Sequence, residues 1–397
     1  MRKQFLGSAF AAAALLALAP GVQAKNYGPG VTDTEIKIGN TMPYSGPASA
    51  YGTIGKAHAA YFKYINDQGG INGRKINYIS YDDGYSPPRT VEQTRKLVEQ
   101  DEVLLLMGQL GTPSNTAIHK YVNSKKVPHL FLSTGASKWN DPKNFPWTMG
   151  WQPNYPNETK NYARHILKTN PNAKVAVLYQ NDDYGKDYLH GLKEGLGDQY
   201  GKMVVAEISY EVTDPTIDSQ MVSLKASGAD TFVNITTPKF AAQAIKKAAE
   251  IGWKPAHYLN SVSNSVGAVL NPAGLDNAKG IYSAFYLKDP VDPQWKDDKD
   301  FKEWIAWMDK YLPDGDKLSS FNVIGYAHAY NMVELLKACG DNLTRENVMK
   351  QAANMDFEIP MLLPGIRVKT SPDDFAPVED EYIGQFNGKS WELLEKM

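Results

Sequence analysis

The sequence predicts an α/β fold with two lobes, each built on a doubly wound, mostly parallel sheet. Short segments typical of strands, which are either wholly apolar or alternate polar and apolar residues, alternate along the chain with amphipathic segments of helical period. This series is interrupted once, at residues 139–156, by a stretch rich in Pro, Asn, Trp and Gly, and then begins again. Regular alternation favours a parallel sheet covered by helices on both faces, and two such series favour two lobes of one architecture.

The first series opens at residues 35–39, where polar and apolar residues alternate as in a strand. Apolar residues then recur at helical spacing from Ile54 to Ile65, and the glycines within residues 67–70 end that helix. The series continues with a strand at 76–81, a helix at 89–100, a buried strand at 103–107, a helix at 113–124 and a strand at 129–132.

The second series resumes the alternation after the interruption. It predicts helices at 157–167, 185–195, 217–226 and 240–251, and strands at 175–179, 203–209 and 231–235. Beyond Tyr286 the pattern is mainly helical, at 301–311, 324–339 and 345–353, and the C-terminal residues predict strands and turns with a hairpin turn at Asn387 and Gly388. We expect lobe 1 to comprise residues 36–150 and 285–365, and lobe 2 residues 151–284 and 366–397.

The N-terminal residues have the organisation of a secretory signal peptide. Arg2 and Lys3 precede an apolar run at residues 5–19, which ends before the small residues Val22 and Ala24. The run is shorter than the roughly 20 residues that a membrane-spanning helix needs. We therefore expect residues 1–24 to be removed near Ala24, and the mature chain to be exported as a soluble periplasmic protein.

Composition argues against several classes of protein. Lys and Arg number 42 and Asp and Glu 44, so the net charge of −2 provides no long-range attraction to nucleic acid or anionic lipid. The single cysteine excludes an intramolecular disulfide and a cysteine-rich metal site. We expect no nucleic-acid partner, no metal and no cofactor.

Enzyme motifs are absent from the sequence. The seven histidines include no pair at metal-ligand spacing, and no Gly-x-Ser-x-Gly elbow is present. Residues 384–390 resemble a phosphate-binding loop but are one residue short between the glycines. Asp82 and Asp83 could serve acid–base chemistry, although a strand end favours a structural or capping role. We expect a protein without enzymatic activity; a site assembled from distant residues would escape this search.

Several segments in a fixed order carry a family likeness: Pro43-Tyr44-Ser45-Gly46-Pro47, Tyr51-Gly52, residues 65–74, Tyr81-Asp82-Asp83 and Tyr184-Gly185. With them the chain resembles the branched-chain amino-acid-binding proteins of ABC importers, the leucine/isoleucine/valine-binding type, from about Ile36 to the C-terminus. The resemblance implies a periplasmic binding protein of type I, with two lobes joined by three crossings. It also implies a monomer that closes on a small ligand and delivers it to the transmembrane subunits of an ABC permease.

The resemblance implies a set of residues for the carboxylate end of the ligand. Thr112 stands where the family has a serine that hydrogen-bonds the carboxylate, and Gly135 and Ser137 match a backbone contact and a hydroxyl contact to the same end. Hydroxyls and backbone N–H groups at helix N-termini bind carboxylates without a buried counter-charge. Thr112 and Ser137 could also be ordinary helix caps, which does not preclude ligand contact.

The resemblance implies aromatic walls for the rest of the ligand. Tyr51 and Phe321 match residues of the side-chain pocket, and Tyr184 matches the aromatic that the second lobe closes over the ligand. These aromatics could instead be core residues, since the chain has 23 Tyr and 13 Phe. Their joint placement at the carboxyl ends of strands, where open α/β sheets bind ligands, favours the site.

The chain departs from the family where the ligand's ammonium group is bound. Val262 stands in place of an acidic residue, and Thr237 replaces a tyrosine. Thr237 and Asn260 can satisfy a neutral polar group but carry no charge for a cation. The cysteine pair of some members is replaced by Tyr85 and Gly111.

These departures leave two ligand classes open. The ligand is either a branched-chain amino acid or a similar molecule, or a carboxylate without an amine, such as an aromatic acid. A second functional reading is a ligand-sensing protein that presents its closed form to a signalling receptor.

Overall fold

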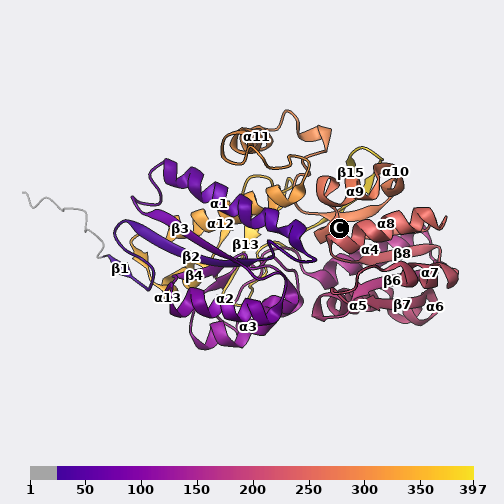
Figure 1. The fold of residues 1–397 in the computed structure, drawn as a ribbon, viewed down its shortest axis with the longest axis horizontal. Coiled ribbons are helices and arrows are strands. Elements are labelled where there is room, and N and C mark those ends of the chain that lie inside the picture. The colour runs from indigo at the N-terminus through magenta and orange to yellow at the C-terminus, as the bar shows by residue number, and fades with distance from the viewer. Residues whose placement is uncertain (1–24) are drawn as a thin grey trace, which may run out of the picture.

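The computed structural model describes residues 25–397, which form two α/β lobes side by side (Figure 1). The signal peptide expected at residues 1–24 lies outside the described residues. No helix among residues 25–397 is long and apolar enough to cross a membrane.

The first lobe contains a four-stranded parallel sheet in the order β3-β2-β4-β5. Strand β2 pairs with β3 along its whole length, from Glu35 with Lys75 to Met42 with Asp82. The sheet is formed by β2 (Glu35–Met42), β3 (Lys75–Asp82), β4 (Leu105–Met107) and β5 (His129–Leu130), which are connected by α1 (Gly52–Asp67), α2 (Pro87–Glu99) and α3 (Thr112–Ser124).

The second lobe contains a seven-stranded sheet in the order β15-β14-β10-β9-β8-β6-β7. Its strands are parallel from β7 to β10, and β14 and β15 extend it as an antiparallel hairpin. The strands are β6 (Val175–Gln180), β7 (Val204–Tyr210), β8 (Thr231–Ile235), β9 (Ala256–Leu259), β10 (Tyr282–Phe285), β14 (Tyr382–Phe386) and β15 (Trp391–Lys396). The main helices are α4 (Tyr155–Thr169), α5 (Asp183–Leu196), α7 (Asp218–Ala226) and α8 (Pro238–Glu250).

Shorter elements and C-terminal helices complete the lobes. α12 packs along α1 in the first lobe, and α13 packs on α12. The helices are α6 (Tyr200–Met203), α9 (Asn271–Ala273), α10 (Leu275–Ala278), α11 (Lys299–Tyr311), α12 (Ser320–Cys339) and α13 (Arg345–Ala352). The short strand pairs are β1 (Asn26–Tyr27) with β11 (Asn342–Leu343) and β12 (Asp356–Phe357) with β13 (Val368–Lys369). Single turns are η1 (Ser49–Tyr51), η2 (Ser137–Trp139), η3 (Gly197–Gln199), η4 (Ser261–Ser263), η5 (Val266–Leu270) and η6 (Pro293–Trp295).

The chain passes between the two sheets three times. It leaves the first sheet after β5, returns to the first lobe after β10, and enters the second sheet again at β14. The second and third passages lie side by side, because Leu287 pairs with Leu362, the backbone N–H of Lys288 donates to the carbonyl of Met361, and that of Leu363 donates to the carbonyl of Tyr286. These two crossing segments are therefore joined to each other by backbone hydrogen bonds.

The predicted α/β fold with two parallel-rich sheets is confirmed. The helices and strands predicted up to residue 251 are present, with ends that differ by a few residues, and the turn at Asn387 and Gly388 joins β14 to β15. β9 and β10 were not predicted, because four-residue strands between glycines and polar residues leave too little periodicity to detect. Asp82 and Asp83 accept backbone hydrogen bonds in the loop after β3, which agrees with a structural role.

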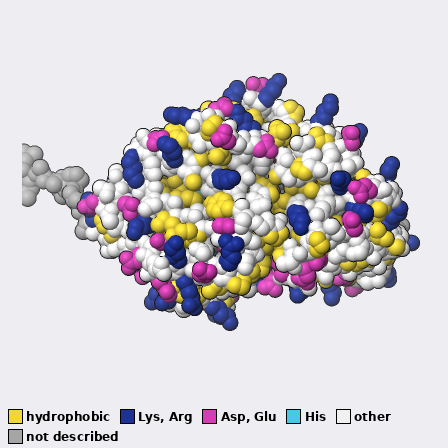
Figure 2. All heavy atoms as spheres, viewed as in Figure 1, with side chains coloured by type: hydrophobic (Ala, Val, Ile, Leu, Met, Phe, Trp, Pro, Cys, Tyr) yellow, Lys and Arg dark blue, Asp and Glu magenta, His cyan; other side chains and the backbone are white. Residues whose placement is uncertain are grey.

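The face drawn in Figure 2 has no large patch of charged side chains of one sign. Lys and Arg side chains are interspersed there with Asp and Glu side chains over both lobes. This distribution agrees with the small net charge of −2.

Candidate functional site

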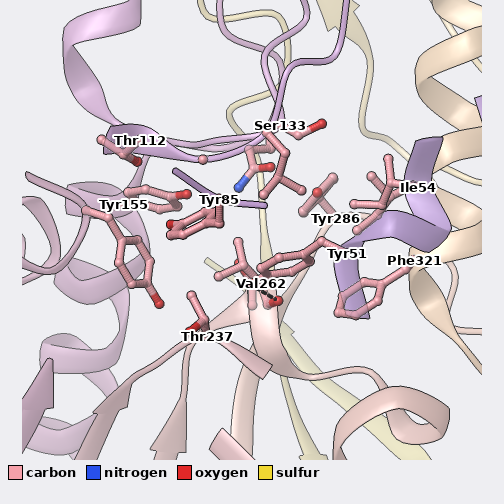
Figure 3. Close-up of a pocket in the computed structure, with 16 residues that line it drawn as sticks. Tyr51, Ile54, Tyr85, Thr112, Ser133, Tyr155, Thr237, Val262, Tyr286 and Phe321 are labelled. Carbon is pink, nitrogen blue, oxygen red and sulfur yellow. Dashed lines mark hydrogen bonds between the residues drawn. The ribbon is translucent and has the colours of Figure 1, made fainter. Parts of the chain in front are cut away.

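A pocket lies between the lobes, at the carboxyl ends of the strands of both sheets (Figure 3). The pocket and the solvent at its open side together occupy about 490 Å³. This is where open α/β sheets place their ligands, because the loops that follow parallel strands meet at one edge. The lining residues are Tyr51, Ile54, Tyr85, Leu110, Gly111, Thr112, Ser133, Gln152, Tyr155, Tyr184, Thr237, Ser261, Val262, Tyr286, Phe321 and Ile324.

The wall of the pocket is aromatic and uncharged. Five tyrosines and one phenylalanine line it, and the lining set contains no Asp, Glu, Lys, Arg or His. The rings of Tyr51 and Phe321 pack with centroids 5.1 Å apart, and those of Tyr155 and Tyr184 with centroids 5.3 Å apart. Offset rings at these distances form stable walls that can hold an apolar or aromatic body.

Tyr51 connects the two lobes across the pocket. It ends η1 at the beginning of α1, and its hydroxyl donates to the carbonyl of Val262, 2.9 Å away in η4 of the second lobe. A second contact joins the lobes nearby, because the side-chain amide of Gln180 in β6 donates to the hydroxyl of Tyr85 at 3.4 Å. The structure therefore shows the lobes closed against each other.

Thr112 has a hydroxyl hydrogen available for a ligand. Its Oγ1 lies 2.6 Å from Oγ1 of Thr134. The Thr134 hydroxyl already accepts hydrogen bonds from Nε1 of Trp139 and from the hydroxyl of Tyr155, each at 3.3 Å. Since those donors occupy its lone pairs, Thr134 donates its own hydrogen to Thr112. The hydrogen of Thr112 can then be donated to the neighbouring Tyr155 hydroxyl or to a ligand in the pocket.

The beginning of α3 adds an electropositive helix end to this side of the pocket. Thr112 is the first residue of α3, and the preceding Gly111 supplies no side-chain cap. The first N–H groups of a helix have no partner within the helix and attract anions. A carboxylate near Thr112 would therefore meet a hydroxyl donor and a helix N-terminus together.

Tyr184 supplies a second free donor from the opposite lobe. Asp182 caps α5 by accepting the backbone N–H groups of Tyr184 and Gly185 at 2.9 and 3.3 Å, which fixes Tyr184 at the helix start. The Tyr184 hydroxyl is buried and has no hydrogen-bond partner among residues 25–397. Burial also raises the pKa of Tyr184 well above its usual value, so the phenol keeps its proton.

Two carboxylates lie behind the pocket wall, and both accept hydrogen bonds from protein groups. Glu158 accepts the backbone N–H and the hydroxyl of Ser261 at 2.8 and 2.6 Å, and the hydroxyls of Tyr162 and Tyr188 at 2.8 Å each. Burial raises the pKa of Glu158, while these donors oppose the rise. Asp182 is engaged by its helix cap and by the amide of Gln180 at 2.6 Å. Neither carboxylate is left for a ligand.

Thr237 and Val262 line the pocket, whereas Asn260 lies behind it. The hydroxyl of Thr237 is 3.3 Å from that of Tyr210. The amide of Asn260 donates to the carbonyls of Asn234 and Thr236 at 2.9 and 3.0 Å, which ties η4 to the loop after β8. Asn260 therefore supports the wall that carries Val262.

Gly135 and Ser137 lie outside the pocket lining. The carbonyl of Gly135 accepts the backbone N–H of Tyr155 at 2.8 Å, so it places a wall residue at the start of α4. The backbone N–H and the hydroxyl of Ser137 donate to the carboxylate of Asp187 in α5, at 2.7 and 2.9 Å. In the closed structure Ser137 thus contacts the opposite lobe.

Sequence reasoning missed several wall residues, among them Tyr85, Gln152, Tyr155, Ser261 and Tyr286. Tyr85 lies in the loop after β3 and could have been found by its place after a strand. Tyr286 follows β10, which has no detectable strand pattern, and Tyr155 lies within the irregular segment at residues 139–156. The described residues contain no group of three His, Cys, Asp or Glu arranged to hold a metal ion.

Comparison with known proteins agrees with this geometry. Residues 35–390 match a model of the family described as periplasmic binding protein. The chain is 25% identical to the Leu/Ile/Val-binding protein homolog 1 of Brucella abortus (strain 2308) over 318 residues, which are 79% of this chain and 81% of that protein.

Solved structures show the same fold. A branched chain amino acid ABC transporter protein from Thermus thermophilus with bound valine matches with a TM-score of 0.82 and 16% identity, over 92% of this chain and 97% of that one. A fatty acid ABC transporter substrate-binding protein from Thermomonospora curvata matches with a TM-score of 0.78 and 23% identity, over 94% of each chain. The two lobes, their three crossings and the match to the family model show that this chain belongs to the periplasmic binding proteins, with the type I fold.

Proposed function

We propose that this chain is the solute-binding protein of an ABC importer and that it captures a small carboxylate without an α-ammonium group. The observation that carries the proposal is the uncharged, tyrosine-rich pocket between the lobes. The family implies a periplasmic location, for which residues 1–24 would serve as a signal peptide cleaved near Ala24. As in the solute-binding family to which it belongs, the chain would bind its ligand without turnover.

The carboxylate would be held by neutral donors from both lobes. The hydroxyl of Tyr184 has no partner among the described residues, that of Thr112 can turn from Tyr155 to a ligand, and α3 begins at Thr112. Hydrogen bonds to a charged acceptor are each worth about 1.5–3 kcal/mol, so a few such donors can replace a counter-charge. Gly135 and Ser137 would act indirectly in this arrangement, through Tyr155 and through the closed position of the lobes.

An α-ammonium would have no carboxylate partner in this pocket. Val262 and Thr237 stand where the resemblance expects residues that bind the ligand's ammonium group. The nearby carboxylates of Glu158 and Asp182 are already hydrogen-bonded. A buried ammonium without a partner costs several kcal/mol. This cost favours the amine-free carboxylate over the branched-chain amino acid.

The aromatic rings would enclose the body of the ligand. Tyr51, Phe321 and Tyr155 offer ring faces and edges, which suit an aromatic or branched aliphatic group. The relative in Brucella abortus is named for leucine, isoleucine and valine, and the structural neighbour in Thermomonospora curvata for fatty acids. Both names describe carboxylates with apolar bodies, the second without an amine.

Calorimetry with matched pairs of compounds tests the proposal. Leucine is compared with 4-methylpentanoate, and phenylalanine with 3-phenylpropanoate. We expect the amine-free member of a pair to bind at least tenfold more tightly, which corresponds to about 1.4 kcal/mol. A tenfold preference for the amino acids would contradict the proposal and would show that a group of the protein binds the ammonium.

A further inference from the structure

A second cavity abuts the ligand pocket. The cavity and the solvent at its open side together occupy about 330 Å³, and Ser261, Tyr286 and Ile324 line both cavities. We call this second cavity the rear chamber. Its remaining lining residues are Asn264, Ala284, Phe285, Leu287, Lys288, Asp289 and Ser320.

The rear chamber lies where the chain crosses between the lobes. Ser320 and Ile324 come from α12 of the first lobe, whereas Ala284 and Phe285 end β10 of the second. The crossing segment that follows β10 brings Asp289 to the chamber. This segment is held in place by its pairing with the third crossing, in which Lys288 N donates to the carbonyl of Met361 at 2.8 Å. The chamber is therefore formed by ordered segments at the place where the chain crosses between the lobes.

Asp289 lines this chamber and has a carboxylate oxygen without a partner. The residue is 5% exposed. Its Oδ1 accepts the backbone N–H of Val291 at 2.9 Å, and its Oδ2 is buried without a hydrogen-bond partner among residues 25–397. A buried acceptor left unsatisfied costs about 1–3 kcal/mol, and more if it is charged, so a donor bound here would recover that cost.

The charges around Asp289 favour a cationic donor. The ammonium of Lys288 is already bound by Asp298 and Asp300, at 2.7 and 3.0 Å. Asp292 adds a further carboxylate whose field acts on Asp289. One lysine thus stands among four carboxyl groups, and the other polar lining residues, including Asn264 and Ser320, are neutral. This arrangement attracts positive charge.

We propose that the rear chamber is a second subsite of the ligand cavity, in which the Asp289 carboxylate binds a protonated amine at the end of the ligand remote from its carboxylate. The inference rests on the proposed function, since the carboxylate would occupy the main pocket near Thr112 and Tyr184. The ligand class is then an ω-amino carboxylate, which has an amine at its far end and none on the α carbon.

The ionisation of Asp289 agrees with such a role. Burial raises the pKa of Asp289 to about 7, with a further rise from the field of Asp292 and an opposing effect of the Val291 N–H. The carboxylate needed for an ammonium forms as the pH rises through this value. Binding of the amine should therefore strengthen between pH 6 and pH 8, while an alkylamine is still protonated.

Two probes and two variants test the subsite. The probes are 3-phenylpropanoate and the same molecule with an aminomethyl group in the para position, measured by calorimetry at pH 8. The variants are Asp289→Asn, which keeps the acceptor for Val291, and the control Asp314→Asn, at an exposed position that does not line the chamber. We expect the amine to improve binding at least tenfold in the wild type and in Asp314→Asn, and to give no improvement in Asp289→Asn. Equal affinity of the two probes for the wild type, or an improvement that survives in Asp289→Asn, would overturn the subsite.

A probe without a carboxylate separates this inference from the proposed function. Methylammonium should raise the melting temperature of the wild type at pH 8 by more than it raises that of Asp289→Asn. If 3-phenylpropanoate does not bind and methylammonium still distinguishes the two proteins, the proposed ligand class is wrong and the amine subsite stands. If methylammonium acts equally on both proteins, the subsite is wrong whatever the carboxylates do.

Discussion

Gly111 and Tyr85 pack so closely that the glycine has no room for a side chain. A Cβ atom on Gly111 would lie 2.5 Å from Cε2 of Tyr85, and Gly111 has a positive φ of +95°. The tyrosine ring passes over the glycine, and both residues line the pocket between the lobes. The absence of a side chain at Gly111 therefore lets the Tyr85 ring form part of the pocket wall.

Substitution of Gly111 should therefore disturb both stability and binding. We expect Gly111→Ala to lower the free energy of unfolding by more than the about 1–3 kcal/mol that a strained backbone costs, because the methyl group also displaces Tyr85. Gly69→Ala is the matched control, since Gly69 has a φ of +106° and no atom within 4 Å of its Cβ position. Urea unfolding of both variants gives the difference. Equal losses of stability would show that the contact with Tyr85 is unimportant.

The hydroxyl of Thr112 offers a direct test of the carboxylate end. Thr112→Val keeps the shape of the side chain and removes the donor, so the affinity for 3-phenylpropanoate should fall by about 1.5–3 kcal/mol. The control Thr116→Val lies one turn further along α3, where the Thr116 hydroxyl donates to the Thr112 carbonyl and not to the pocket. Calorimetry should show little change in the control. A Thr112→Val protein with unaltered affinity would rule out this hydroxyl as a carboxylate donor.

The contact between Ser137 and Asp187 separates two roles for Ser137. If Ser137 acts by holding the lobes closed, Ser137→Ala and Asp187→Ala should weaken ligand binding by similar factors, and the double variant should be little worse than either one. If Ser137 contacts the ligand itself, the two losses should add. Calorimetry on the three variants gives the coupling energy. We expect a coupling of about 0.5–3 kcal/mol, the range for residues in direct contact.

Local patterns account for most of the fold and for part of the site. β2 and α1 are encoded by residue alternation and helical spacing, so their positions follow from short segments. Five of the eight predicted ligand-binding residues line the pocket: Tyr51, Thr112, Tyr184, Thr237 and Phe321.

The remaining features depend on contacts between distant segments. Ser137 contacts Asp187 only because the two lobes are closed against each other. Tyr286 reaches the pocket because β10 joins the second sheet, and the four residues of β10 are too few to predict that pairing from the sequence. The rear chamber is formed by three segments far apart in the chain. No local pattern contains such information, and only the assembled lobes reveal it.

The buried carboxyl group of Glu381 should destabilise the fold increasingly as the pH rises. Glu381 is buried beside Glu158, its Oε1 has no partner among the described residues, and its Oε2 accepts only a long bond of 3.4 Å from Asn161. Burial, and then the charge of Glu158, raise the pKa of Glu381 well above its usual value of 4.5. At Glu381 the folded state therefore holds a proton that the unfolded chain releases above pH 4.5, and the contribution of this group to the free energy of unfolding declines with rising pH.

Replacement of Glu381 should remove part of this decline. Glu381→Gln cannot ionise, so we expect it to be more stable than the wild type by more than about 1 kcal/mol at pH 8, the least that an unsatisfied buried charge costs, and to differ little at pH 4.5. The matched control is Glu92→Gln at an exposed position of α2. Urea unfolding at several pH values measures the three proteins. A Glu381→Gln protein that gains nothing over the wild type between pH 4.5 and pH 8 would mean that Glu381 is ionised and well solvated in the folded state, and that the space beside Glu158 admits water or a cation.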